Sequence, residues 1–317
     1  MKNITVFAVL VIMIQCAQFA FSQEEKAASY VFSTGTKFGM FFGQTEEIVY
    51  PPLSHKAELL SQLLWDVKPV FYYGLTMDFS RAQPMTQWGF FSTFFLRSGI
   101  PGNSGDMEDR DWQSTVNADL TNYSISDNIT NNLLFLDFSA GFSFPIKRIL
   151  LMKTYLTVSY MHFSFSAENG YYIYAPSFGG DGTKKPLDGK VIDYTQDWLI
   201  IAPGVSLGYY FDTRFYAELS FQISPLIICN DIDQHLTRKI QFQDYMRGGL
   251  FLEPGFHFSW FAGKRLELSL DFSWRYISGT WGETYVSTIP AQYYTELGTA
   301  GAGMSMIDTG LCLKIHL

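Results

Sequence analysis

The sequence is poor in charge and in cysteine, and after its first residues it has no long apolar run. Charged residues make up 16% of the 317 residues, below the roughly 25% of an ordinary soluble domain. Aromatic residues reach 17%, a share that excludes intrinsic disorder and a coiled coil. The 3 cysteines are too few for a disulfide-stapled miniprotein. The 22 basic residues against 30 acidic ones give a net charge of −8, which argues against a nucleic-acid partner and suits cationic ligands.

The first residues form a segment of their own. Lys2 precedes a nearly apolar run at residues 4–14, and the small residues at positions 20 and 22 come before a polar stretch. This pattern predicts a secretory signal peptide over residues 1–22 and a single mature domain over residues 23–317. A lipoprotein signal ending at Cys16 is the alternative, although the residues before Cys16 are larger than such sites prefer. The apolar run is shorter than the roughly 20 residues of a transmembrane helix.

Beyond residue 23 the main pattern is alternation. In residues 266–276 every even-numbered side chain is apolar or aromatic and every odd-numbered one is polar, and residues 215–223 and 307–317 alternate similarly. Successive side chains of a strand point to opposite faces, so each segment has one apolar and one polar face. A soluble β-sandwich has the same period. The signal peptide, the segment lengths and a terminal strand that reaches the last residue favour an all-β fold, a ten-stranded antiparallel transmembrane β-barrel.

Short and long connections alternate along the chain, as they do in outer-membrane barrels. Short turns are expected near residues 80–84, 145–148, 211–214 and 261–265, and long extracellular loops near residues 50–56, 97–118, 168–190, 230–238 and 280–299. The expected strands are 29–49, 56–79, 84–98, 117–144, 152–175, 190–211, 214–231, 236–260, 264–285 and 301–317. Many exceed the roughly 9–11 residues that cross a bilayer, so the barrel is expected to extend beyond the outer leaflet.

Two of these expected loops carry residues with catalytic chemistry. The first holds Asp109 and Asp111, and the second holds Asp231, Asp233 and His235. Within each segment the residues share one face of an extended backbone, and both loops belong to the extracellular rim. A histidine is a suitable general base that a neighbouring carboxylate can orient, and two close carboxylates can share a proton. Either segment alone could also be an ordinary solvated acidic loop.

These residues carry a resemblance to a known family. The sequence D-x-D-W at residues 109–112 and D-x-D-x-H at residues 231–235 resemble the two catalytic segments of the omptin family of outer-membrane proteases. Three further stretches match in order and spacing over nearly the whole mature chain: residues 46–50, residues 60–66, and residues 164–167 leading to residues 170–174. The resemblance implies a ten-stranded barrel with a protease site at its extracellular mouth, in the outer membrane of a diderm bacterium.

The resemblance also implies residue roles. Asp233 and His235 would form the dyad that activates water, and Asp109 and Asp111 the opposing carboxylate pair.

Two further acids match the family's specificity pocket. Glu47 and Asp231 would hold a basic side chain before the scissile bond, because carboxylates bind a guanidinium bidentately and an ammonium as a point charge. The expected partners are therefore peptides or proteins with basic residues. No metal or organic cofactor is expected, and the sequence has neither an H-E-x-x-H zinc motif nor a G-x-S-x-G nucleophile elbow.

The remaining candidates favour structural roles. His55, His162, His257 and His316 have no acid near them in a catalytic pattern, and Cys229 fits a barrel wall better than a nucleophile.

The chain departs from the family in two places. His162 stands where lipopolysaccharide-dependent members have an arginine, with Tyr160 at the position of the partner acid, so dependence on lipopolysaccharide is doubtful. The last residue is Leu317 instead of the usual aromatic residue. Both departures fit an envelope of unusual lipid composition, and they fit equally a relative that has lost activity.

The sequence therefore predicts an outer-membrane endopeptidase that cleaves exposed polypeptides after arginine or lysine. The alternative is a non-proteolytic barrel, a porin or an adhesin, on the same fold.

Overall fold

A computed structural model of the chain describes residues 30–51, 57–81, 87–290 and 295–317, and nearly all of this backbone is strand. The strands are β1 (Tyr30–Tyr50), β2 (Ser61–Arg81), β3 (Gly89–Gly99), β4 (Gly102–Asp111), β5 (Asn122–Lys147), β6 (Leu150–Tyr174), β7 (Lys185–Pro186), β8 (Lys190–Tyr210), β9 (Phe215–Ser224), β10 (Ile227–His235), β11 (Ile240–Arg247), β12 (Leu250–Phe261), β13 (Leu266–Ser278), β14 (Trp281–Thr288) and β15 (Thr295–His316). The described residues also contain one short 3₁₀ helix, η1 (Pro176–Phe178). None of their helices is long and apolar enough to cross a membrane. The predicted signal peptide lies outside the described residues.

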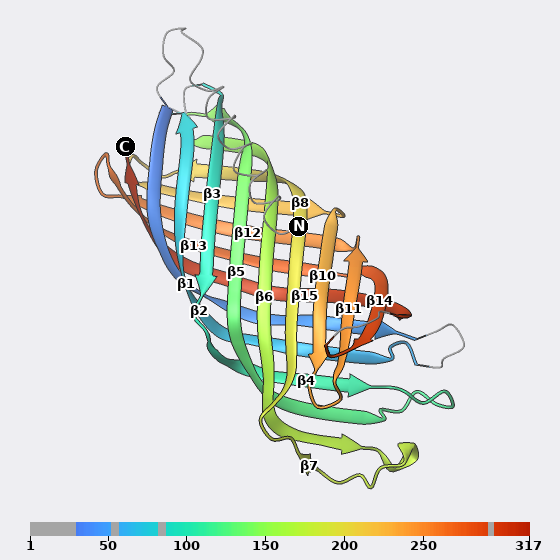
Figure 1. Cartoon of the computed structure of the whole chain (residues 1–317). Coiled ribbons are helices and arrows are strands. Elements are labelled where there is room, and N and C mark those ends of the chain that lie inside the picture. Colours follow the sequence, from blue (N-terminus) through green and yellow to red (C-terminus); the bar gives the residue numbers. More distant parts are fainter. Residues whose placement is uncertain (1–29, 52–56, 82–86, 291–294) are drawn as a thin grey trace.

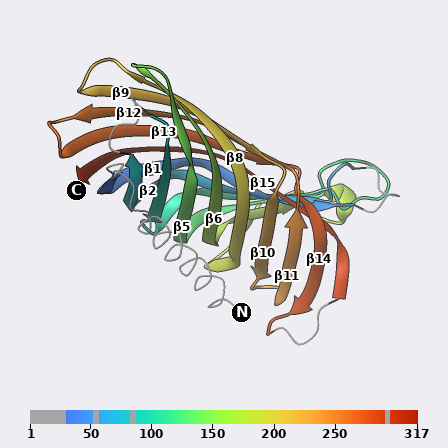
Figure 2. The same ribbon diagram turned by 90° about the horizontal axis from the view of Figure 1, so that it is seen from above.

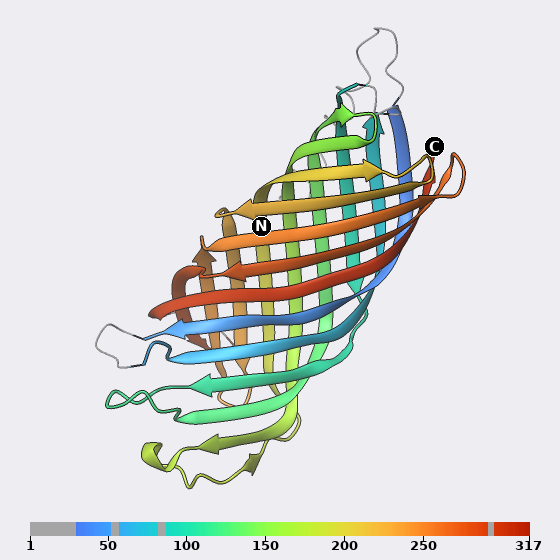
Figure 3. The same cartoon turned by 180° about the vertical axis from the view of Figure 1, so that it is seen from behind.

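The strands form one closed antiparallel ring (Figure 1). Around the ring the order is β8, β9/β10, β12/β11, β13/β14, β15, β1, β2, β3/β4, β5 and β6, and β6 pairs with β8 again. A slash joins two shorter strands that share one position of the ring. Counted this way, the described strands occupy ten positions, and the short β7 pairs with β6 at the tip of the ring. Figure 3 shows the last strand, in red, beside the first strand, in blue, which closes the ring. The predicted all-β, ten-stranded barrel is therefore confirmed.

Three of the predicted loops are wrong, because much of each is strand; one of them, at residues 280–299, contains β14 and the start of β15. Within the segment expected as a loop at residues 97–118, β4 pairs with β2 and β5, and within the loop expected at residues 230–238, β10 pairs with β8 and β11. Polar residues on both faces resemble a loop in sequence, yet neighbouring strands satisfy their backbone hydrogen bonds. At some positions of the ring the chain forms two shorter strands instead of one long strand. The break between β11 and β12 falls at Gly248 and Gly249, where positive φ angles of 74° and 92° favour glycine.

The outer surface of the ring changes character along the strands. On β13 the alternating residues Leu266, Leu268, Leu270, Phe272 and Trp274 are all exposed and apolar, as a lipid-facing belt requires. On β10 this apolar outer face continues to Ile228, and beyond it the half-buried Ile232 lies between the polar residues Asn230 and Gln234. The last part of β10 and its neighbours therefore lies beyond the belt, on the rim of the barrel.

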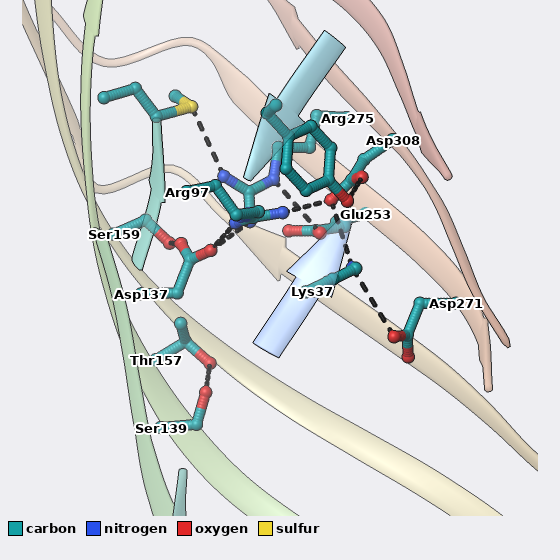
Figure 4. Close-up of polar contacts among 12 residues, drawn as sticks. Lys37, Arg97, Asp137, Ser139, Thr157, Ser159, Glu253, Asp271, Arg275 and Asp308 are labelled. Atoms are coloured by element: carbon teal, nitrogen blue, oxygen red, sulfur yellow. Dashed lines mark hydrogen bonds and ion pairs between the residues drawn. The ribbon is translucent and has the colours of Figure 1, made fainter. Parts of the chain in front are cut away.

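At the end of the barrel where short turns connect the strands, the interior holds a network of ion pairs (Figure 4). We call it the lumen network. It comprises Lys37, Arg97, Asp137, Glu253, Asp271, Arg275 and Asp308. It lines a cavity of about 200 Å³ inside the barrel. Charged side chains facing inward are the polar interior expected of a membrane barrel.

Above the lumen network the interior is apolar. Phe41, Trp65, Phe135, Phe163 and Trp198 belong to a core in which each of these side chains is at most 1% exposed. Phe41 and Phe135 stack with ring centroids 4.4 Å apart, and Trp65 stacks on Tyr194 at 4.9 Å. A packed aromatic layer across the lumen does not fit the continuous aqueous channel that the porin alternative requires.

Candidate active site

Acidic side chains gather on the inner face of the rim, beyond the apolar layer. We call them the rim acids: Glu47 on β1, Asp109 and Asp111 on β4, Asp231 and Asp233 on β10, and Asp244 on β11. They alternate with outward-facing residues along their strands, so the period of the strand aims them inward. Figure 2 shows β10, β11 and β14 side by side along one part of the ring. The predicted site residues therefore come from three separated parts of the chain and meet at one end of the barrel.

Asp233 and His235 form a hydrogen-bonded pair on β10. The Nε2 atom of His235 lies 2.6 Å from Oδ2 of Asp233, and Asp233 is 1% exposed. A carboxylate can only accept a hydrogen bond, so Nε2 of the neutral ring carries the proton and Nδ1 has the lone pair. The guanidinium of Arg238, on the turn after β10, donates to Nδ1. The edge of the His235 ring also packs against Phe242 at 5.4 Å.

Asp109 and Asp111 face this pair from β4. The amide of Asn122 donates to Oδ2 of Asp111 at 3.1 Å, whereas Oδ1 of Asp109 is buried without a hydrogen-bond partner. Burial and the nearby carboxylate of Asp111 raise the pKa of Asp109 to about 7, while His235 acts in the opposite direction. Asp109 is therefore partly protonated near neutral pH.

Electrostatic contact across the ring shows how the two groups are arranged. Asp109 interacts with both His235 and Asp233, which are attached to a strand that does not pair with β4. Among the described residues no hydrogen bond joins Asp109 directly to His235. Asp109 and His235 therefore interact across the ring without a direct hydrogen bond.

Glu47 and Asp231 lie deeper, and each is 2% exposed. Burial raises the pKa of Glu47 well above its ordinary value, and the charges of Asp233 and Asp231 add to the shift. Burial and the charge of Asp244 likewise raise the pKa of Asp231, although the hydroxyl of Tyr194 donates to it at 3.0 Å. Neither acid has a basic partner within ion-pair distance among the described residues. A cationic ligand would supply the missing charge.

Asp244 was not singled out from the sequence. It lies on β11 opposite Asp231 in the strand register and is fully buried. Burial is the main cause that raises its pKa to about 7, and Asp233 adds to the shift. A signal was present, since the hairpin that turns at residues 236–239 pairs each position of β10 with a predictable position of β11. The error in the loop boundary concealed this pairing.

The expectation that the other histidines lack acidic partners is wrong for three of them. His162 lies 2.8 Å from Asp197, His257 lies 2.6 Å from Asp271, and a nitrogen of His316 lies 3.0 Å from Glu267. These acids come from other strands, so their proximity could not be seen along the sequence.

Two more expectations concern His55 and Cys229. His55 lies outside the described residues. Cys229 is fully buried and belongs to the apolar core, so its side chain serves the interior packing, as the sequence predicted.

Within the part of the chain that the structure describes, no three His, Cys, Asp or Glu side chains are arranged to hold a metal ion.

Comparisons with known proteins agree with the geometry. A family model described as the Omptin family matches residues 28–315. The plasminogen activator of Yersinia pestis is 24% identical over 262 residues, which cover 79% of this chain and 78% of that protein. The crystal structure of the outer membrane protease OmpT from Escherichia coli superposes with a TM-score of 0.79 at 17% identity, covering 92% of this chain and 99% of that one. The structural likeness shows that the two chains share a fold.

Proposed function

The chain belongs to the omptin family of outer-membrane proteases, and from this premise we propose that it is an endopeptidase that cleaves exposed polypeptides after arginine or lysine. The protein is an outer-membrane protein of a bacterium, and the proposal places its active site on the exterior. Asp233 and His235 activate a water molecule, and Asp109 and Asp111 act from the opposite side. No metal or organic cofactor takes part.

The observation that carries the proposal is the pairing of Asp233 with His235, buried at the rim and opposed by the Asp109 and Asp111 pair. A solvated acidic loop would expose Asp233 and His235, and an adhesin would not require a carboxylate–imidazole pair facing two further carboxyl groups. Strongly perturbed acids gathered at one place are typical of functional sites.

The proposed reaction begins with Nδ1 of His235 taking a proton from water. Asp233 holds the ring through Nε2 and stabilises the imidazolium that forms. The hydroxide attacks the peptide carbonyl, and the proton held by Asp109 and Asp111 stabilises the oxyanion. His235 then returns its proton to the leaving amine. Because Arg238 donates to Nδ1 in this structure, that guanidinium must move before water can reach the base.

The substrate preference follows from Glu47 and Asp231. Both are buried carboxylates without a basic partner, and an arginine or lysine side chain before the scissile bond would neutralise them. An uncharged side chain would leave them unpaired, which is costly away from water.

The lipid requirement is a separate part of the proposal. On the outer wall Tyr160 and His162 both bind Asp197, at 2.6 and 2.8 Å. Neither position 160 nor position 162 is an arginine, and lipid phosphates are held best by arginine. We therefore expect activity without lipopolysaccharide.

The test is cleavage of a quenched fluorescent peptide with two adjacent basic residues by protein refolded in detergent, with and without lipopolysaccharide. We expect the wild type to cut after a basic residue and His235→Ala to lose cleavage while remaining a heat-resistant folded barrel. A matched control is His162→Ala, a histidine on the outer wall that should leave cleavage unchanged when lipopolysaccharide is absent.

Two outcomes would reject the proposal. Full activity in His235→Ala would exclude the dyad, and a folded wild type that cuts no peptide would favour the adhesin alternative.

A further inference from the structure

Asp244 is a buried acid that the proposed mechanism does not use. Its side chain is 0% exposed, and its carboxylate lies beside the hydroxyl of Thr284 and the carboxyl of Asp231, but neither of its oxygens makes a well-formed hydrogen bond. Desolvating a carboxylate without such compensation is unfavourable. Asp244 carries this desolvation cost without an ion pair to any described residue that would offset it, so its presence calls for a functional explanation.

The strand register places Asp244 within the proposed substrate site. Asp231 is its partner on β10 and Thr284 is its partner on β14. Directly opposed residues on antiparallel strands point to the same face with their Cβ atoms roughly 5 Å apart. The three side chains therefore form a row on the inner face of the rim, and the row begins at an acid already proposed to bind substrate.

Two like charges directly opposite one another destabilise a sheet. The lumen of this barrel avoids such contacts, since its acids each bind a basic side chain. The rim keeps them: Asp231, Asp244 and Glu47 have no basic partner among the described residues. A ligand with several donors and a positive charge is the partner that would satisfy all three.

We propose that Asp244 is a third acid of the substrate site and that, with Glu47 and Asp231, it makes the site selective for the guanidinium of arginine over the ammonium of lysine. This inference rests on the proposed function.

The preference for arginine over lysine follows from the number of buried oxygens that lack a well-formed hydrogen bond. These oxygens are Oε2 of Glu47, Oδ1 of Asp231 and both oxygens of Asp244. A guanidinium offers five N–H donors in a plane, whereas an ammonium offers three. The five donors of a guanidinium are enough for all four acceptors, whereas the three donors of an ammonium are not. An ammonium would leave part of the row unpaired, and a buried unpaired acceptor is the costly outcome.

Protons compete with the substrate for this site. The ionisable groups that interact with Asp244 or with its neighbour Asp231 are Glu47, Asp231, Asp233, Tyr194 and Cys229. The basic residues of the lumen network are not among them. Near pH 7 the cluster holds protons because burial raises the pKa of its acids. A guanidinium stays charged throughout this range, so its binding should release protons and its KM should rise as the pH falls below about 7.

The experiment uses two fluorogenic peptides that differ only in arginine or lysine before the cut. The wild type, Asp244→Asn and the control Glu283→Gln are compared; Glu283 is an exposed acid on the outer face of β14, next to Thr284. We expect Asp244→Asn to lower kcat/KM for the arginine peptide about 10- to 100-fold, the worth of hydrogen bonds to a charged group. The lysine peptide should lose less than about 3-fold, and the control should match the wild type.

An unchanged ratio of arginine to lysine cleavage in Asp244→Asn overturns this inference and leaves the proposed function intact. A wild type that cleaves neither peptide rejects the proposed function, and this inference with it. If Asp244→Asn does not fold, Asp244→Ser replaces it.

Binding can be measured without catalysis. Titration of His235→Ala with N-acetyl-arginine amide and with N-acetyl-lysine amide should show tighter binding of the arginine compound, and adding Asp244→Asn should remove the difference. Equal affinities in the presence of Asp244 would contradict the assignment.

Discussion

The lumen network and the rim acids are two clusters of ionisable side chains inside one barrel, separated by an apolar layer. In the lumen network Asp137 binds both Arg97 and Arg275, and Asp308 binds Arg97 and Lys37 (Figure 4). Tyr72 adds a hydrogen bond of 2.6 Å to Asp308. At the rim, the acids lie among other acids instead.

The acids of the lumen network are paired with basic side chains and stabilise the fold, whereas the rim acids are not paired in this way. Removing a partner from a satisfied network leaves a buried charge uncompensated. Removing an acid from an unsatisfied cluster relieves repulsion. The same substitution, Asp to Asn, should therefore harm stability in the lumen and function at the rim.

The largest effect is expected for Asp233→Asn at the rim. The amide cannot stabilise the imidazolium of His235, and kcat should fall by up to about 10⁴-fold, as in the related Asp–His pair of serine proteases. Barrel stability should change little. Steady-state kinetics with the dibasic peptide measures the rate, and the heat-induced gel shift of the barrel measures folding. A variant with wild-type kcat would mean that the pair has no part in catalysis.

The reverse is expected for Asp137→Asn in the lumen network. It leaves Arg97 and Arg275 without their shared carboxylate, so the free energy of unfolding should fall by about 3–5 kcal/mol. Cleavage per folded molecule should stay near that of the wild type. Urea unfolding in detergent checks this, with the exposed Asp106→Asn as a control that should lie within about 0.5 kcal/mol of the wild type. Equal stability in both variants would show that the network does not hold the barrel together.

A double change at the rim sharpens the contrast. Glu47→Gln with Asp231→Asn removes two carboxylates proposed to hold the basic side chain, and such a loss costs about 2–5 kcal/mol, or tens- to thousands-fold in kcat/KM. Glu47→Lys alone should be worse, because it opposes the charge of the substrate. Glu46→Gln is the matched control, since Glu46 is the adjacent residue on the opposite face and binds Gln62. A peptide library cut without basic preference by the wild type would refute the assignment.

The smallest effect is expected in the pH dependence of stability. The pKa of Asp244 is raised in the folded state to about 7, so the folded protein holds this proton more tightly than the unfolded chain does. The contribution is fully present below the ordinary pKa of about 4 and is lost as the pH rises through about 7. Between pH 6 and pH 8 the loss should be about 1 kcal/mol. Urea unfolding at both values should show it in the wild type, and Asp244→Asn should reduce it.

The sequence by itself determined the strand pattern and indicated the candidate site residues. Alternation at residues 266–276 reports the two faces of a strand because the side-chain period of a strand is fixed. The short motifs around Asp109 and His235 identified candidate residues because their spacing is local.

The tertiary structure decided the neighbours. Asp231 faces Asp244 and Asp137 meets Arg275 only because strand register and ring closure bring distant residues together, and no local pattern encodes that pairing. It also decided which acids are charged, since a pKa depends on burial and on the charges nearby. The loops predicted around Asp109 and His235 became strands for the same reason: their backbone hydrogen bonds come from neighbouring strands, which a single segment of sequence does not contain.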